Sequence, residues 1–334
     1  ASDVYKRQVF AVLGAIAAFG IGNIAQVNSI ADSIKSVAIA FNEDAANKEM
    51  LICLITGICV AIFVALVLLG GVKRIGQVTE KLVPGMAVIY IVCALVVVFA
   101  NISAVPGVFA SIFKGAFNPA AVTGGAAGMS IKLAMTKGVG RGVFSNEAGL
   151  GSAPIAHAAT SERNPVKQGL YGIFEVFMDT IVICTITSLA VLCSGVWTQE
   201  GLSSGQLALA AFQSVFGNFG AIFVAITVFM FVFSTIISAG FFGQIQAEIL
   251  FGRKFSKIWV FMYPLFIGIA CAFSNVTTMY MITDGFMAII VILNMIGLLL
   301  MCKQVKDLQK EYYNTPGMYY LADKAAKEAK KAAK

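Results

Sequence analysis

Charged residues are scarce in this sequence. Only 12% of its 334 residues are charged, whereas an ordinary soluble domain has about a quarter. Hydrophobic residues make up 59% of the chain, and its mean hydropathy is +0.86. Such a composition excludes a water-soluble surface. Because one span needs about 20 apolar residues and the chain supplies such runs repeatedly, we expect a single all-α polytopic membrane domain.

Motifs for metals, nucleotides and nucleic acids are also missing. The chain has one histidine, His157, and its seven cysteines form no CxxC pair, so we expect no metal centre and no cofactor. A phosphate-binding loop is absent, which argues against a self-contained ATP-driven pump. The net charge of +7 arises in short loops and the tail. There it sets orientation in a lipid bilayer, so we expect no nucleic-acid partner.

Eight apolar segments follow one another along the chain. Three basic loops, Lys73–Lys81, Arg163–Lys167 and Arg253–Lys257, and the lysine-rich tail alternate with loops poor in basic residues. By the positive-inside rule this predicts eight spans with both chain ends in the cytoplasm. We expect residues 1–8 to be a non-native or linker start, 9–302 a transmembrane domain and 303–334 a cytoplasmic tail. The segments are 9–40, 51–71, 83–102, 129–159, 169–194, 207–247, 257–273 and 279–302.

The fourth segment has a composition that disfavours one continuous helix. Positions 138–154 hold five glycines and a proline, and these cost about 1 and 3 kcal/mol each inside a helix. We predict a discontinuity between Ser145 and Gly151, with half-helix ends that suit a cation and a carboxylate. Close helix packing by small residues is the alternative. The polar Arg141, Asn146 and Glu147 in the same stretch favour a functional break.

Two other segments carry polar side chains on apolar helices. Gln26 can hydrogen-bond a solute or join two helices, and the second use is the commoner one for a buried amide. Ser234 and Thr235 place two hydroxyls side by side, which suits a hard cation such as sodium. Hydrogen bonding of these hydroxyls back to a helix carbonyl is an equally good interpretation of the residues alone.

The stretch from Arg141 to His157 resembles the signature of the alanine or glycine:cation symporter family, also called the sodium:alanine symporters. Supporting matches lie at 20–31, 73–81 and 233–235, and the likeness covers about residues 9 to 302. The resemblance implies a leucine-transporter-like inverted-repeat fold with about eight of eleven transmembrane helices present. We expect an upstream broken helix to be missing, so that the chain alone would not transport.

The resemblance also implies roles for single residues. Ser234 and Thr235 would supply sodium ligands, with sodium as the coupling ion. Ala239 stands where the family often has tryptophan, which predicts an enlarged pocket that admits glutamine as well as alanine and glycine. The substrate site would be lined by Gln26, Phe144, Ser145, Asn146, Gly149 and Ala239.

The function indicated is sodium-coupled symport of small neutral amino acids across the cell membrane by alternating access, and not catalysis. A membrane-embedded enzyme would use Glu147 and His157 as acid and base. However, ten residues and a break separate them, and no nucleophile with an orienting group is evident. A channel or a scaffold protein is the third class, which saturable, sodium-dependent transport would exclude.

Overall fold

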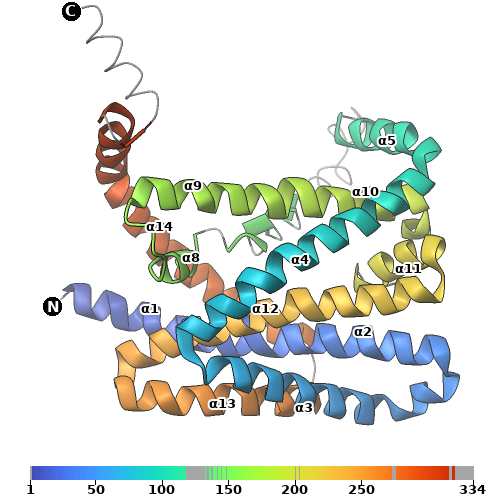
Figure 1. The fold of residues 1–334 in the computed structure, drawn as a ribbon, viewed down its shortest axis with the longest axis horizontal. Coiled ribbons are helices and arrows are strands. Elements are labelled where there is room, and N and C mark those ends of the chain that lie inside the picture. Colours follow the sequence, from blue (N-terminus) through green and yellow to red (C-terminus); the bar gives the residue numbers. More distant parts are fainter. Residues whose placement is uncertain are drawn as a thin grey trace, which may run out of the picture.

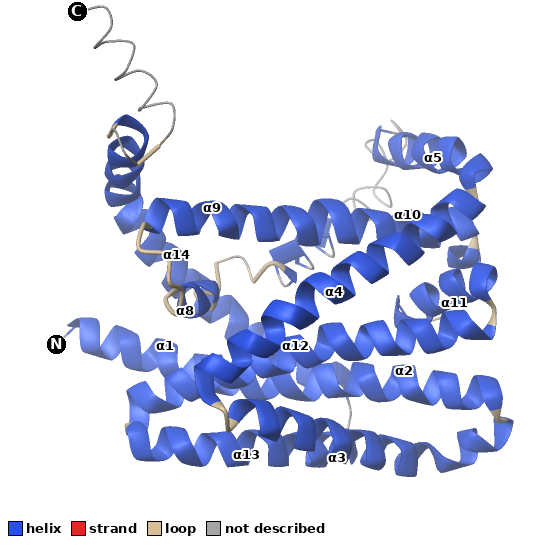
Figure 2. Cartoon of the chain, in the orientation of Figure 1, coloured by secondary structure: helices blue, strands red, loops and turns tan. Residues whose placement is uncertain are grey.

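A computed structural model describes residues 2–117, 149–199, 201–202, 204–272, 276–315 and 318–319. Between 118 and 148 it describes residues 132, 135–136, 138–140, 142–143 and 145–147. Within these residues every regular element is a helix, and none is a strand (Figures 1 and 2). The all-α prediction is therefore confirmed for the described part of the chain.

Most successive helices are joined by a few residues, whereas the stretch 118–152 between α5 and α8 is described only in part. In chain order the elements are α1 (Ser2–Phe19), the π-helix η1 (Gly20–Ala25), α2 (Gln26–Phe41), the 3₁₀-helix η2 (Glu43–Lys48), α3 (Glu49–Leu68), α4 (Gly71–Ala100), the 3₁₀-helix η3 (Ile102–Ala104), α5 (Val105–Phe117), α8 (Ala153–His157), α9 (Pro165–Val176), the π-helix η4 (Phe177–Cys184), α10 (Thr185–Ser194), the 3₁₀-helix η5 (Val196–Thr198), α11 (Ser204–Phe216), α12 (Asn218–Phe251), α13 (Arg253–Ala272) and α14 (Val276–Asn314).

Six stretches of the described residues are long and apolar enough to cross a membrane. Side chains on their outer faces are exposed, for example Ile55 and Leu300 at 53% and 79%, as expected where lipid is the solvent. The chain is therefore of the multi-pass membrane protein class. The six stretches are Gln8–Ile39, Glu49–Leu68, Gly71–Ala100, Pro165–Ser194, Asn218–Phe251 and Gly285–Asn314.

Several predicted boundaries are wrong, including that of the expected loop Arg253–Lys257, which is the beginning of α13. The expected segment 207–247 is two helices, α11 and α12, because Gly217 between them has a φ of +59° and turns the chain. The expected loop Lys73–Lys81 is the beginning of α4, because Gly71, with a φ of +66°, makes the whole turn. The expected segment 129–159 lies largely outside the described residues.

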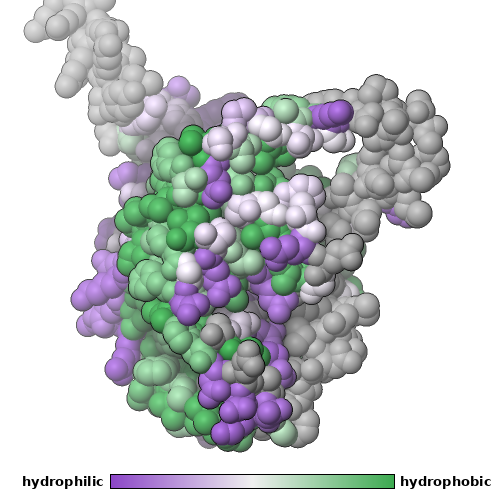
Figure 3. All heavy atoms as spheres, turned by 90° about the vertical axis from the view of Figure 1, so that its right-hand side faces the viewer, coloured by the Kyte–Doolittle hydropathy of each residue, from purple (hydrophilic) through white to green (hydrophobic). Residues whose placement is uncertain are grey.

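The three turns beside the basic residues, here called the basic turns, lie at one end of the bundle. The α3–α4, α8–α9 and α12–α13 turns are all at the left of Figure 1, together with the N-terminus. The turns after α2, α4 and α10 lie at the right, and Figure 3, which looks onto that end, shows hydrophilic patches beside apolar flanks. The shared location of the basic turns agrees with the predicted loop alternation.

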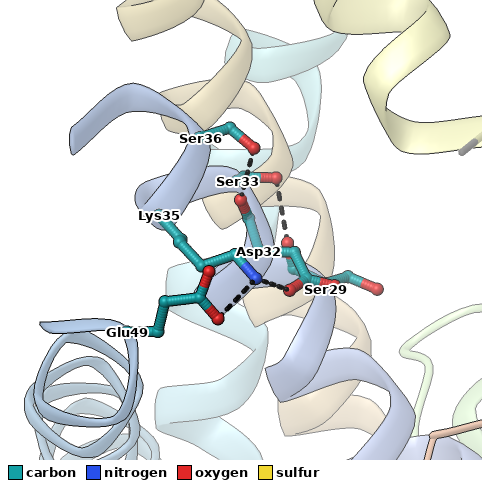
Figure 4. A network of polar contacts seen from close by, with 6 residues as sticks. All are labelled: Ser29, Asp32, Ser33, Lys35, Ser36 and Glu49. Atoms are coloured by element: carbon teal, nitrogen blue, oxygen red, sulfur yellow. Dashed lines mark hydrogen bonds and ion pairs between the residues drawn. The ribbon is translucent and has the colours of Figure 1, made fainter. Parts of the chain in front are cut away.

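A polar network joins α2 to α3 near the right-hand end (Figure 4). The Lys35 ammonium lies 3.4 Å from the Glu49 carboxylate and 3.6 Å from that of Asp32. The Ser33 and Ser36 hydroxyls donate to carbonyls one turn earlier in α2. Ion pairs this exposed contribute little free energy, but they hold the α2–α3 corner in register.

The helix α12 is the centre of the bundle and packs against α1, α2, α3, α4, α11 and α13. Glycines let its neighbours approach closely. A Cβ added to Gly243 would lie 2.3 Å from the Trp259 ring, and one added to Gly240 would lie 2.8 Å from the Tyr263 ring. Fully buried Ile236 and Ile237 complete this contact with α13.

The π-helix η1 interrupts the first span where it meets α12 and α13. The hydroxyl of buried Tyr263 lies 3.0 Å from the carbonyl oxygen of Gly22 and 3.1 Å from that of Ile236. In return, the Asn23 amide donates to the backbone oxygen of Tyr263 at 3.0 Å. Because π turns leave the α-helical hydrogen-bond pattern, these contacts from α13 stabilise the interruption. It positions the side chains that follow, beginning with Gln26.

Candidate functional site

The chain breaks its helix between Ser145 and Ala153. Residues 146–147 and 149–152 are turns or irregular, and α8 begins at Ala153 with Pro154 in its first turn. Gly149 and Gly151 have φ angles of +81° and +75°, which glycine adopts without steric cost. The predicted discontinuity between Ser145 and Gly151 is confirmed.

The backbone at Glu147 indicates that the break has a defined conformation. Its φ of +49° is the single positive value of a non-glycine residue in the described part of the chain. Such conformations persist only where surrounding contacts fix them, and they concentrate at functional sites. Here the Ser152 hydroxyl donates to the Glu147 carboxylate, and the Asn294 amide of α14 donates to the Gly149 carbonyl at 2.9 Å.

The next span docks onto the break through its π-helix η4. Ser145 donates to the Asp179 carboxylate at 2.7 Å, and the Thr180 hydroxyl donates to the Asn146 side-chain oxygen at 2.8 Å. The Asn146 amide group donates to the Gly142 carbonyl at 2.9 Å. Both side chains predicted for the substrate site therefore already have partners within the protein.

Asp179 is a site residue that the sequence analysis missed. It lies halfway along the apolar stretch Pro165–Ser194 and is partly buried. An ionisable side chain at that depth is itself a signal of function, because a charge in hydrocarbon is costly.

A cavity of about 320 Å³ lies between the break and the central helices. Of the predicted residues, Gln26, Ser145, Thr235 and Ala239 line it. Its described lining contains two carboxylates and no basic side chain. The lining residues are Phe10, Gly14, Ala17, Ala18, Gly22, Gln26, Ser145, Glu147, Leu150, Ser152, Ile155, Asp179, Thr235, Ala239, Phe242, Gln246, Met287 and Ile290.

The remaining predicted site residues lie elsewhere. Asn146 and Ser234 are not part of the cavity wall, and neither is Gly149, where an added Cβ would lie 3.4 Å from the Met295 sulfur. Phe144 lies outside the described residues. The structure thus brings together one polar side chain from each of four segments, namely Gln26, Ser145, Asp179 and Thr235.

The two hydroxyls predicted to bind a cation are both hydrogen-bonded within α12. Ser234 and Thr235 donate to the carbonyl oxygen of Phe231 at 2.7 and 3.1 Å. This is the back-bonding alternative that the sequence left open. A hydroxyl that donates its proton in this way keeps its lone pairs, and only Thr235 presents them to the cavity.

Ala239 lies where α12 and η1 make their closest contact. A Cβ added to Gly22 would be 2.3 Å from the Cβ of Ala239. The side chain at position 239 therefore serves two roles, because it closes the helix contact and forms part of the cavity wall. A larger side chain at this position would have to displace η1 or extend into the cavity.

His157 and Glu147 have separate partners. The His157 ring lies 2.6 Å from the Gln168 amide and 3.4 Å from the Glu175 carboxylate, whereas Glu147 bonds to Ser152. Among the described residues no three His, Cys, Asp or Glu side chains gather as a metal site would require.

Comparison with known proteins gives one consistent result. Residues 6–322 match the sequence model of the sodium:alanine symporter family. The chain is 40% identical over 306 residues to the sodium/alanine symporter AgcS of Methanococcus maripaludis, covering 91% of this chain and 64% of that protein. It is 43% identical over 269 residues to the uncharacterized transporter YflA of Bacillus subtilis, covering 80% and 57%.

A third relative differs in its named solute. The chain is 37% identical over 280 residues to the probable sodium/glutamine symporter GlnT of Bacillus subtilis, covering 83% of this chain and 56% of that protein. The chain thus spans between half and two thirds of the length of these relatives.

Proposed function

Because this chain belongs to the sodium:alanine symporter family, we propose that it forms most of a secondary active transporter that couples sodium to the movement of a small neutral amino acid. The observation that carries the proposal is the break at residues 145–152, which forms one wall of a partly open, acceptor-rich cavity in an apolar bundle. Interrupted spans of this kind free backbone groups for solutes at membrane depth.

The fold we propose is the leucine-transporter-like inverted repeat, with about eight of eleven transmembrane helices in this chain. The basic turns and the C-terminus would face the cytoplasm. Single-cysteine labelling in the α3–α4, α8–α9 and α12–α13 turns tests this topology. Labelling of any one of them from outside intact cells would refute it.

In the proposed mechanism the amino acid occupies the cavity between the break and α12. Gln26, Ser145, Asn146, Gly149 and Phe144 would form its site, with backbone groups of the break. Ser234 and Thr235 would bind sodium, of which Thr235 is the better placed because it lines the cavity. Two groups of helices then rock to expose the site to either side.

Sodium-driven accumulation is the decisive test. The complete open reading frame that encodes this chain is reconstituted in proteoliposomes, and labelled alanine uptake is measured with an inward sodium gradient and with potassium in its place. We expect saturable accumulation above the external concentration only with sodium, abolished by a sodium ionophore. Uptake that is linear in concentration or indifferent to sodium would favour a channel and refute symport.

The solute is proposed to include residues larger than alanine, because Ala239 leaves space where the family often has an indole. The relative named as a sodium/glutamine symporter supports this range. Each additional buried methylene is worth about 0.8 kcal/mol, which is a several-fold preference. We expect glutamine to compete with labelled alanine in the natural protein and to lose this ability in Ala239→Trp, while glycine continues to compete. An unchanged ranking would show that position 239 does not set pocket size.

A further inference from the structure

One side chain in the cavity is left with an unmet hydrogen-bonding requirement. Gln246 of α12 is 3% exposed, and its Oε1 has no hydrogen-bond partner among the residues that the structure describes. An unpaired buried oxygen is costly, and buried polar groups are paired in nearly all cases. Since Gln246 lines the cavity, rotation of its amide group would bring this oxygen to a ligand with a hydrogen-bond donor and remove the cost.

Gln246 is far from the proposed central site along the same helix. It lies eleven residues beyond Thr235, which is about 16 Å at 1.5 Å per residue, in the direction of the turn at Gly252. The opposite wall has the same extent, because both Gln26 and Gly14 belong to it. The cavity therefore extends from the middle of the bundle towards the end that carries the basic turns (Figure 1).

The surroundings of Gln246 favour an ammonium group over a bare metal ion. Its side chain lies across Gly14, where an added Cβ would be 3.2 Å from its Cγ, and Ala17 and Ala18 line the same wall. These neighbours supply no side-chain oxygens, whereas a hard cation needs several together. An ammonium group can be held by one acceptor after another along a path, and the Glu147 carboxylate, at the break, is a further acceptor in the same cavity.

We propose that Gln246 is a second station for the transported amino acid, on the path between the central site and the basic end of the bundle, where its Oε1 accepts a hydrogen bond from the solute's ammonium group. This inference rests on the proposed symport and adds a binding site to it. A solute that binds there would have a shorter distance to cross, without a hydrogen-bond partner, between the central site and the solution.

The test compares affinities from the two membrane faces. The complete open reading frame is reconstituted, with sidedness established by trypsin cleavage of the basic turns, and alanine KM is measured from each side. Gln246→Met keeps the length of the side chain and removes the oxygen, whereas Gln246→Glu keeps an acceptor. Thr227→Val is the matched control, because Thr227 is a buried polar residue of α12 whose hydroxyl bonds only within the helix.

We expect Gln246→Met to raise KM about tenfold from the basic face, the change that loss of one hydrogen bond to a charged group produces. KM from the opposite face should stay within about twofold, since the central site is unchanged. Gln246→Glu should retain the basic-face affinity, and Thr227→Val should leave both faces unchanged.

Three results would overturn the station. The first is an unchanged basic-face KM in Gln246→Met. The second is an equal rise of KM at both faces in both Gln246 variants, with a lowered thermal midpoint, which would make Gln246 a packing residue. The third is a rise in sodium KM alone, which would assign the site to sodium. Absence of sodium-driven uptake in the natural protein would instead refute the symport.

Discussion

The contact between η1 and α12 allows a quantitative prediction from two small residues. A methyl group added at Gly22 would lie 2.3 Å from the Cβ of Ala239, whereas ordinary contact begins at 3.4 Å. The two helices would have to separate by about 1 Å, and overpacking of this kind costs about 1–3 kcal/mol. We therefore expect Gly22→Ala to lower the thermal midpoint of the purified protein by several degrees.

The same clash predicts a specific rescue. Ala239→Gly removes the obstructing methyl group, so the double variant Gly22→Ala, Ala239→Gly should be more stable than the sum of the single changes predicts. We expect a coupling free energy of about 1 kcal/mol or more, as for residues in direct contact. Gly268→Ala in α13 is the matched control, because an added Cβ there meets no atom of a described residue within 4 Å.

The assay is the midpoint of thermal unfolding in detergent, monitored by the loss of monodisperse protein, for the natural chain, the three single variants and the double variant. If the effects of Gly22→Ala and Ala239→Gly add without coupling, the two residues do not touch. In that case the close approach of η1 to α12, and with it the location of Gln26, would have to be rejected.

Four further predictions concern single side chains. Thr235→Val should weaken apparent sodium affinity in transport assays, whereas Thr227→Val, which lies outside the cavity, should not; equal effects would contradict the cation assignment. Asp179→Ala should lower transport without preventing assembly of the protein, as judged by gel filtration, because its carboxylate accepts the bond that fixes the break; unchanged transport would leave Asp179 without a role. Asn164→Ala should destabilise the start of α9 by about 1 kcal/mol, since the Asn164 side-chain oxygen caps two backbone amides. Hydrogen exchange of those two amides measures this loss of stability, and an unaltered exchange rate would count against the cap. Hydrogen bonding from the backbone amide of Asn164, and then Lys167, lower the pKa of Glu162 below its usual 4.5. The protection from proteolysis that Glu162 gives this loop should therefore be full above pH 4.5 and be lost as the pH falls through the lowered pKa. Glu162→Gln should abolish this pH dependence of proteolysis, and a dependence that persists in the variant would belong to another group.

Sequence patterns predicted the parts of this molecule that depend on local chemistry. The break followed from glycines and a proline that no continuous helix accommodates, and Gly149 and Gly151 indeed have positive φ angles. The grouping of the basic turns at one end followed from charge alone. Both features depend on residues that are close together in the sequence.

Features that depend on distant partners could not be predicted in this way. The π-helix η1 is fixed by Tyr263, some 240 positions away in the chain. The unpaired oxygen of Gln246 becomes apparent only when α1 is placed against α12. The basic residues after Gly71 suggest a loop, although residues 72–82 hold no proline and a single glycine, Gly76, and form part of α4.

The π-helices η1 and η4 have a consequence for comparisons between relatives. A π turn holds one residue more than the α turn it replaces, and one residue corresponds to a rotation of about 100° about the helix axis. A relative with a single-residue deletion within 20–25 would restore an α-helix and turn the side chain equivalent to Gln26 away from the cavity. Gaps of one residue at η1 or η4 in an alignment would therefore mark changes of solute, even where every polar residue of the site is retained.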